Sequence, residues 1–329
     1  MMISNVHTCL GKAFMSVTMA MLSLLLGGCC NAPVCLEPGL LGEPPELVVT
    51  VQADSSKDLG FPSPAIGTVQ VGDEPLGILV ETKEDRVADV VWSGVSGGVG
   101  GLAGAGMMLA GMAAATPPRE QRTREAIGEA PDGLDLVDRF QDSMVGALEH
   151  EFTRSSVRVD GHCESRKEGT HLVLEVQMVL SGLEHEMLPR TTATLRLHHE
   201  GKTVWGATFL HFGPKRPLSG PGGWQDDGWR NLRQEARQAL LDLSSAIATE
   251  MRNPQMRAPD DVRWGAQIGR ANLDRSVMDY QHDKTYRLNA VFPSPRYHVI
   301  QRDSRRTSLQ TPLANVVYNV PSSAVTLRK

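Results

Sequence analysis

Aromatic residues are scarce in this chain: Phe, Trp and Tyr make up 5% of its 329 residues, whereas hydrophobic residues as a whole make up 41%. A core of this composition cannot depend on aromatic packing and must be built from Leu, Val, Ala and Met. Charged residues amount to 22%, which is typical of a globular protein. The length allows one sizeable core or two small ones.

Motifs of enzymes and metal sites are also scarce. The chain contains no Gly-x-x-x-x-Gly-Lys phosphate loop and no His-Glu-x-x-His metal motif. His198 and His199 point to opposite faces of a predicted strand and cannot share a metal without a bulge. His162, Cys163 and His171 could form a metal site, but surface histidines without ligand spacing are the simpler interpretation. We therefore predict a non-enzymatic protein with no catalytic residues, no cofactor and no metal.

Charge is nearly absent from the first 28 residues, which hold one cation, Lys12, and no acid. The chain from Ala13 to Leu26 is almost entirely apolar and is followed by two glycines. This is the layout of a secretory signal peptide, and the apolar run is too short to span a hydrocarbon core of about 30 Å. The sequence therefore predicts a signal peptide over residues 1–28.

The end of this segment, Leu26-Gly27-Gly28-Cys29, resembles the lipobox of bacterial lipoproteins. In that family the Cys thiol receives a diacylglyceryl group, a peptidase cuts before it, and the new N-terminus is acylated. The resemblance implies lipidation at Cys29 and anchoring in a lipid bilayer, where each buried methylene contributes about 0.8 kcal/mol. Because Cys30 and not Asp follows, it also implies an outer-membrane lipoprotein that faces the periplasm. An ordinary secreted protein or an uncleaved apolar N-terminus is the alternative.

Three cysteines remain after Cys9 leaves with the signal peptide and Cys29 is lipidated. In an oxidising periplasm, Cys30 could pair with Cys35 and leave Cys163 as a buried thiol. A disulfide that includes Cys163 is the other option.

Composition divides the rest of the chain into a Pro/Gly-rich tether over 29–46, a domain over 47–253, and a basic, partly ordered tail over 254–329. The tail holds 12 Lys and Arg against 6 Asp and Glu, whereas residues 29–253 hold 20 against 32. The tail could dock on the domain, on anionic lipid or on a partner, and ordinary solvated charge explains the asymmetry equally well. We expect no nucleic-acid partner, because only Arg302, Arg305 and Arg306 favour one.

Hydrophobic periodicity predicts the elements of the domain. Helices are expected over 134–154, capped by Asp132 or Asp135, and over 229–251, capped by Asp227. A third helix is expected over 260–281 in the tail. Strands are expected at 46–53, 66–71, 77–82, 156–162, 172–180, 193–198 and 205–209. The predicted fold is α+β, a mainly antiparallel sheet covered on one face by two long amphipathic helices, with a Gly-rich apolar helical segment and an extended C-terminal tail.

That Gly-rich segment is an insertion over residues 90–115, which contains no charge. Gly94, Gly97, Gly98, Gly101 and Gly104 include pairs spaced four apart, which on a helix would form a flat packing face. The segment resembles the glycine zippers of envelope lipoproteins, which implies insertion in a membrane and a homo-oligomer. A Gly-rich loop or a small buried helix is the alternative, because each glycine disfavours helix by about 1 kcal/mol relative to alanine.

The stretch 190–251, with Gly201-Lys202-x-Val204-Trp205 in its central hairpin, resembles a domain of envelope lipoproteins of the penicillin-binding-protein-activator and curli-secretion-channel types. Those families lack the glycine insertion, so no residue role carries over from them.

The loop 214–228 carries Lys215, Arg216 and Trp224, which are candidate contacts for a partner. Alternatively, Trp224 is a packing residue folded back on the helix. The leading functional hypothesis is an envelope lipoprotein that acts as a non-enzymatic accessory or assembly factor for an envelope protein or polymer. The second is a glycine-zipper oligomer for transport or secretion, and the third is a hydrolase whose site the sequence does not reveal.

Overall fold

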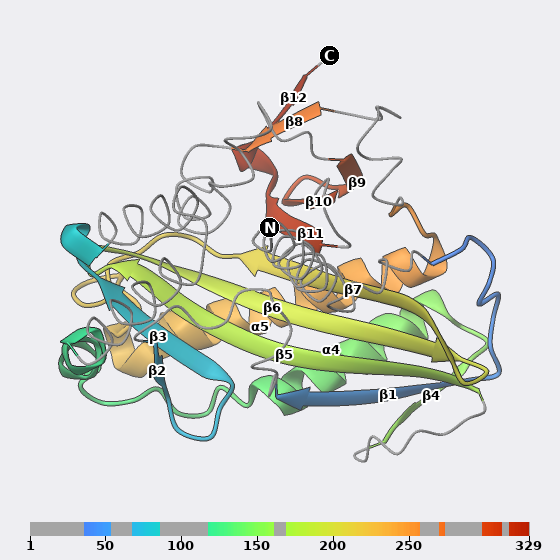
Figure 1. Cartoon of the computed structure of the whole chain (residues 1–329), viewed down its shortest axis with the longest axis horizontal. Helices are drawn as coiled ribbons and strands as arrows, with labels where there is room; N and C mark the ends of the chain where they lie inside the picture. Colours follow the sequence, from blue (N-terminus) through green and yellow to red (C-terminus); the bar gives the residue numbers. More distant parts are fainter. Residues whose placement is uncertain are drawn as a thin grey trace, which may run out of the picture.

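A computed structural model describes residues 36–53, 68–85, 118–160, 169–256, 270–273, 298–310 and 316–328. A ten-stranded sheet runs through them (Figure 1). Its strands are β1 (Glu46–Ala53), β2 (Val69–Gln70), β3 (Leu76–Glu81), β4 (Ser156–Val159), β5 (Thr170–Leu183), β6 (Glu186–His199), β7 (Lys202–Phe212), β9 (His298–Arg302), β10 (Arg306–Gln310) and β11 (Val316–Pro321). The main order is β2-β3-β5-β6-β7-β11-β10-β9, and β1 pairs with β4 and β5.

The centre of the sheet is an antiparallel meander of β5, β6 and β7. Alternating side chains of these strands, such as Leu174 and Leu195, are buried on one face, as their period of two predicts. The predicted hairpin between β6 and β7 is confirmed. Its turn residues Glu200 and Gly201 both have positive φ, at 50° and 73°, as a tight type I′ turn requires.

Parallel pairs surround this meander. β1 and β3 lie one after the other along the same edge of β5, and both run parallel to it. β1 is also parallel to β4, and β7 is parallel to β11. Each of these pairs joins strands that are far apart in the chain, as parallel neighbours must be.

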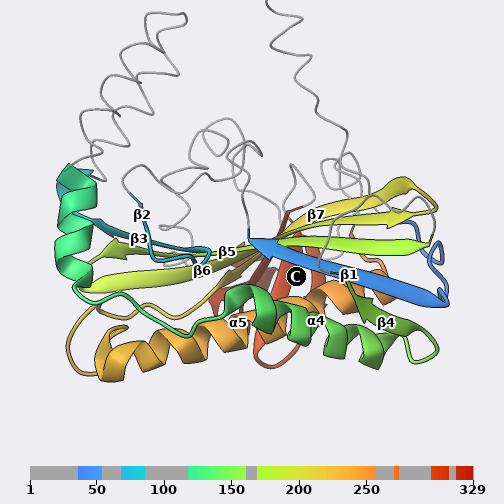
Figure 2. The same ribbon diagram turned by 90° about the horizontal axis from the view of Figure 1, so that it is seen from below.

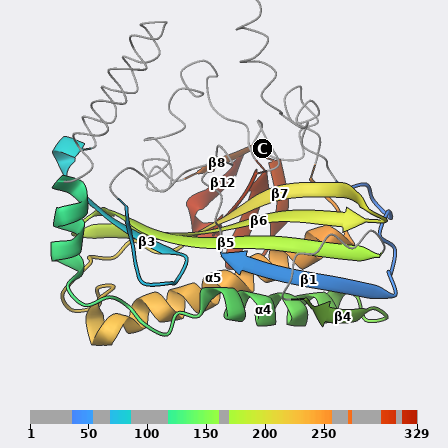
Figure 3. The same cartoon turned by 60° about the horizontal axis from the view of Figure 1, so that its bottom comes forward.

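The helical layer consists of α4 (Leu136–Glu151) and α5 (Asp226–Arg252). The two helices lie side by side (Figures 2 and 3). Helix α4 contacts β1, β4 and β5, and α5 contacts β6 and β7. Both predicted apolar stripes are buried, from Phe140 and Met144 on α4 to Leu240 and Ile247 on α5.

The predicted fold class is wrong in its helices and its tail. The sheet is mostly antiparallel, as predicted, but it is mixed, because four of its pairings are parallel. The helices are not two long covers, since α5 has 27 residues and α4 only 16, and residues 118–127 add further helix at the end of the sheet (Figure 2). The tail is not simply extended, because β9, β10 and β11 continue the sheet beyond β7.

The predicted helix over 260–281 is also wrong where the structure describes it. Residues 270–273 form β8 (Arg270–Leu273), which pairs with β12 (Val325–Arg328) in a separate two-stranded sheet. A short 3-10 turn, η1 (Ser322–Ala324), comes directly before β12 in the chain. The tail strands also bury a second apolar cluster, which includes Phe212 of β7 and Tyr318 of β11 in an edge-to-face contact. Burial against β7 therefore decides the structure of the tail.

The predicted helix caps are wrong, because distant or backbone groups replace them. Asp135 precedes α4 in a left-handed conformation and makes no side-chain cap. Instead the carboxylate of Glu74 accepts hydrogen bonds from the backbone N–H groups of Asp135 and Leu136, at 2.8 and 3.1 Å. Asp227 does not cap α5, since residues 227–229 have positive φ and regular helix begins after them.

Glu250 is a buried acid in the last turn of α5. Its Oε1 accepts the backbone N–H groups of Gln255 and Met256, at 2.7 and 2.6 Å. Burial outweighs these hydrogen bonds and raises the pKa of Glu250 from 4.5 to about 7. The folded state thus holds this proton more tightly than the unfolded state does.

Glu250→Gln is expected to stabilise the protein at pH 8 and to have little effect at pH 5. The contribution of a group with a raised pKa is present below its unfolded pKa of 4.5 and is lost as pH rises through about 7. The shift corresponds to about 3 kcal/mol, and the amide avoids this cost while its oxygen still accepts both N–H groups. Urea unfolding at both pH values measures the effect, with Glu149→Gln on the exposed side of α4 as the control. A loss of stability at pH 8 would contradict the prediction.

Candidate protein-binding surface

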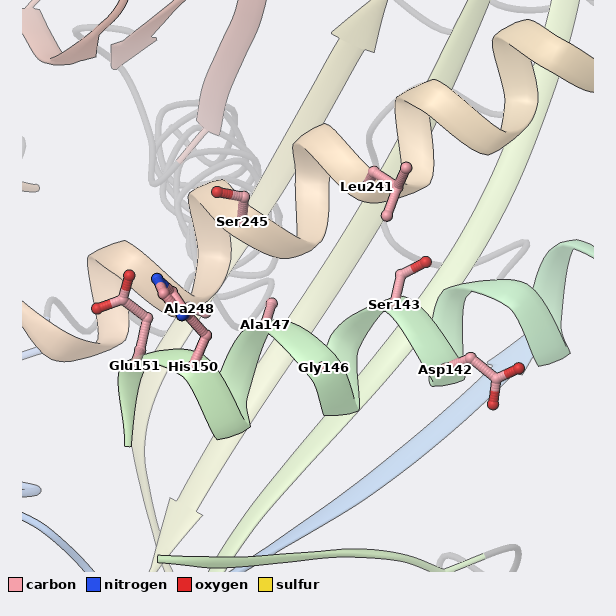
Figure 4. A pocket seen from close by; sticks show the side chains of 9 residues that line it. All are labelled: Asp142, Ser143, Gly146, Ala147, His150, Glu151, Leu241, Ser245 and Ala248. Carbon is pink, nitrogen blue, oxygen red and sulfur yellow. The ribbon is translucent and has the colours of Figure 1, made fainter. Parts of the chain in front are cut away.

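A groove follows the line between α4 and α5 on the side that faces away from the sheet. The two helices run in the same direction, so the order of residues along α4 matches the order along α5 (Figure 4). The middle of this α4–α5 groove is a hollow of about 360 Å³. It is lined by Asp142, Ser143, Gly146, Ala147, His150, Glu151, Leu241, Ser245 and Ala248.

Leu241 is the apolar anchor of the groove. Its side chain is 47% exposed, the most of any large hydrophobic residue that the structure describes. Around it lie small side chains, among them Gly146, Ala147 and Ser245. Small residues let another backbone approach closely, and burying the exposed half of a leucine would contribute about 1 kcal/mol to binding. The middle of the groove therefore suits a close, largely apolar contact.

The N-terminal end of the groove is rich in arginine. A second hollow, of about 320 Å³, is lined there by Gly133, Arg139, Arg230, Arg233, Gln234 and Arg237. Arg139 comes from α4, whereas the other three arginines lie at three- and four-residue intervals on α5, which places them on one side of that helix. Two neighbouring helices thus bring four guanidinium groups to one depression.

Three of these arginines already have acidic neighbours. Arg139 pairs with Asp135 at 3.2 Å, Arg230 with Asp227 at 2.7 Å, and Arg233 with Asp132 at 3.5 Å. The acids lie on the rim, with side chains 52%, 68% and 99% exposed. Such exposed pairs typically contribute about 0–1 kcal/mol each, so an incoming anion can displace them.

Arg237 differs from the other three, because it makes no ion pair with any residue that the structure describes. It is exposed and lies one turn before Leu241 on α5. Arg237 thus joins the arginine hollow to the apolar middle of the groove.

The opposite end of the groove carries His150 and Glu151 of α4, and both side chains are drawn beside Ala248 in Figure 4. The groove therefore has arginines at one end, Leu241 and mostly small residues with Asp142 in the middle, and Glu151 at the other end. This gradient of charge gives the groove a direction.

The predicted partner loop is only partly available. Trp224 is fully buried, and its indole N–H donates to the carbonyl of Met187 at 3.0 Å. The guanidinium of Arg216 lies over the Trp224 ring at 5.4 Å, and Lys215 pairs with Glu186 at 2.8 Å. This is the geometry of the packing alternative for Trp224, and any partner contact of this loop depends on Lys215 and Arg216.

A buried polar cluster ties the tail to the domain, and sequence patterns did not reveal it. His211 of β7 donates from Nε2 to Glu235 of α5 at 3.1 Å and accepts at Nδ1 from Arg306 of β10 at 3.0 Å. Because arginine is only a donor, this histidine is neutral, and burial lowers its pKa below 6.5. Arg306 also donates to Asn319 Oδ1 at 2.6 Å and faces Asp242 Oδ2 at 3.8 Å.

This His211 cluster has a structural role. The side chain of His211 is 2% exposed, so no substrate reaches it as a base. Burial also lowers the pKa of Arg306 to about 10, which leaves it charged at neutral pH. The cluster joins β7, α5 and the tail strands with a single cation between acids.

Two further kinds of site, for a metal ion and for a catalytic serine, were sought in the chain. Across those residues no three His, Cys, Asp or Glu side chains are close enough to hold a metal ion. The sequence Gly94-Val95-Ser96-Gly97-Gly98 matches the Gly-x-Ser-x-Gly pattern of a nucleophile elbow. The prediction of a non-enzymatic protein did not take this motif into account. It lies outside the described residues.

Several predicted sites also fall outside the described residues. They are Cys29, the other cysteines Cys30, Cys35 and Cys163, and the glycine face of Gly94, Gly97, Gly98, Gly101 and Gly104. Within the described ranges, no helix is both long and apolar enough to cross a membrane. The lipidation site, the disulfides and the glycine-zipper oligomer all remain predictions.

Two sequence patterns on α5 indicate residues of the groove, although the groove was not predicted from them. One is the spacing of Arg230, Arg233 and Arg237, which predicts a basic stripe along a helix. The other is Leu241, an apolar residue beside Leu240 but off the buried stripe. Neither signal shows that α4 supplies the other wall.

Comparisons with known proteins give only weak similarities. No protein-family model matches the chain, and no curated protein matches its sequence. Among solved structures, a minor lipoprotein from Acinetobacter baumannii matches with a TM-score of 0.25 and 14% identity, over 35% of this chain and 84% of that chain. An uncharacterized protein matches with a TM-score of 0.23 and 15% identity, over 35% of this chain and 66% of that chain. No family is thereby shown for this protein.

Proposed function

We propose that the protein is a membrane-anchored envelope lipoprotein that acts as a non-enzymatic accessory factor and binds a protein partner through the α4–α5 groove. The observation that carries the proposal is Leu241, which is left exposed in a hollow of small residues beside four arginines. A single exposed leucine is common on protein surfaces, but Leu241 lies in a hollow of small residues with a hollow of arginines beside it, and such concave surfaces are where ligands and partners bind.

The lipobox at Cys29 supports the anchored part of the proposal. Acyl chains hold a domain at a membrane surface without spanning it, and the tether over 29–46 would separate the two. A domain held in this way searches for partners in two dimensions, so a groove of moderate affinity is sufficient.

Crosslinking in cells tests the groove directly. A photoreactive residue at Ser245 is expected to give a discrete protein adduct, because Ser245 lines the hollow beside Leu241. The matched control is the same residue at Lys202, the exposed first residue of β7. Leu241→Glu should reduce the Ser245 adduct about tenfold, because it would place a carboxylate without a partner in an apolar contact.

Leu241 belongs to neither buried core cluster, so Leu241→Glu should leave the melting temperature within a few degrees of the original. An adduct of equal yield with Leu241→Glu, or no adduct at Ser245, would refute the proposal.

A further inference from the structure

We infer that the occupant of the α4–α5 groove is an amphipathic helix of a partner protein, with a narrow apolar stripe and an acidic end that lies on Arg139, Arg230, Arg233 and Arg237. The inference rests on the proposed function, because it names the kind of partner that the same groove would bind.

Charge identifies the end that lies on the arginines. Four guanidinium groups line one hollow, and guanidinium binds carboxylate through two parallel hydrogen bonds. Their present partners Asp132, Asp135 and Asp227 are exposed on the rim, where ion pairs contribute little to stability. Two or three carboxylates of a partner can therefore replace them, and Arg237 offers a cation that has no described acid beside it.

Shape identifies the occupant as a helix. The groove from Arg237 to Ala248 spans 11 residue steps of α5, which is about 16 Å at 1.5 Å per residue. From Arg230 it extends to about 27 Å, which matches a partner helix of about five turns. Two parallel helices with small residues between them offer a groove into which the ridge of a third helix packs.

The acidic end of the groove fixes the orientation of that helix. Glu151 would repel the acidic end of a partner that lay in the reverse direction. Specificity would thus come from attraction at the arginines and repulsion at Glu151.

Acids of α4 outside the groove argue against an anionic membrane as the occupant. Asp138 and Glu149 line neither hollow and are exposed on α4. A flat layer of lipid phosphates would meet these carboxylates together with the arginines, whereas a helix in the groove meets only the residues that line it.

Designed peptides test the inference on the full-length lipidated protein in uncharged nanodiscs. The probe is an 18-residue helix with an Ala/Leu stripe, three Glu at one end and three Lys at the other. The comparison peptides are an exchanged form, in which the three Glu are replaced by Lys so that both ends are positive in either orientation, and an alanine-substituted neutral helix. Fluorescence anisotropy is expected to show at least tenfold discrimination between the peptide and its exchanged form.

Variants of the groove add a charge-reversal test. Arg233→Glu with Arg237→Glu should weaken the original peptide at least tenfold and strengthen the exchanged peptide, and this gain shows that the variant is folded. Arg196→Glu is the matched control and should change neither affinity by more than about twofold, because Arg196 is exposed between the buried Leu195 and Leu197 and so lies on the face of β6 opposite the helices.

Two outcomes would overturn the inference. One is equal binding of both peptides, and the other is arginine-dependent binding to phosphatidylglycerol vesicles without peptide discrimination. If either occurs while the Ser245 adduct still depends on Leu241, the inference about the occupant fails and the proposed function stands. If the Ser245 adduct is absent, the proposed function fails first.

Discussion

Arg306→Met is expected to lower the free energy of unfolding by about 3–5 kcal/mol, the usual cost of removing one partner from a buried ion pair. The guanidinium is the only described cation inside the His211 cluster, where it faces Asp242 and donates to His211 and Asn319. Without it the nearby carboxylates of Glu235 and Asp242 lose their compensating charge, and Nδ1 of His211 loses its donor. Chemical unfolding at pH 7.5 measures the change.

The neighbouring residue Arg305 supplies the control for this variant. Its side chain is 65% exposed, and it lies 3.8 Å from Asp242 Oδ1. Arg305→Met removes the same charge from the same strand region, yet we expect a loss below about 1 kcal/mol, because the Arg305 side chain is mostly in solvent. Equal losses for the two variants would show that the net charge of the tail matters and that the buried cluster does not.

Cys29→Ala is expected to abolish acyl anchoring of the protein. If the lipobox functions as the resemblance implies, the native protein carries acyl groups on an N-terminal Cys29, and this variant carries none and keeps residues 1–28. Several acyl chains, at about 0.8 kcal/mol for each buried methylene, give durable attachment, so their loss removes the protein from the outer-membrane fraction.

Mass spectrometry of the mature N-terminus together with membrane fractionation measures this effect. Cys30→Ala is the matched control, because it changes the adjacent thiol and should leave both mass and location as in the native protein, apart from the substitution itself. Normal acylation of the Cys29→Ala variant would refute the assignment of the lipidation site.

Periodicity predicted most of the single elements correctly. The stripe around Phe140 on α4 and the stripe around Leu240 on α5 are both buried, and the alternating strands of the meander have the predicted inward faces. These patterns are local, since each depends on the geometry of one helix or one strand.

Periodicity does not identify which strands, helices or side chains become neighbours in the fold. An alternating pattern does not say whether a strand such as β1 is parallel or antiparallel to its neighbour, so the mixed sheet was missed. For the same reason Asp135 was expected as a cap, although Glu74, distant in sequence, caps α4. In the α4–α5 groove, the arginine spacing on α5 was visible, but the contribution of Arg139 depends on how the two helices pack.

The pairing of β11 with β7 sets the order in which this chain can be finished. Val316 lies opposite Thr208, so one of the inner strands of the sheet gains its neighbour only when residues 316–321 have been made. Pairing across such a separation is slow, because a long loop must close before any contact forms. A product that ends before residue 298 would therefore present β7 as an unpaired edge, and such edges recruit strands from other molecules. For this protein, premature termination is thus a route to aggregation, because β11, β10 and β9 protect the edge of β7 from pairing with other molecules.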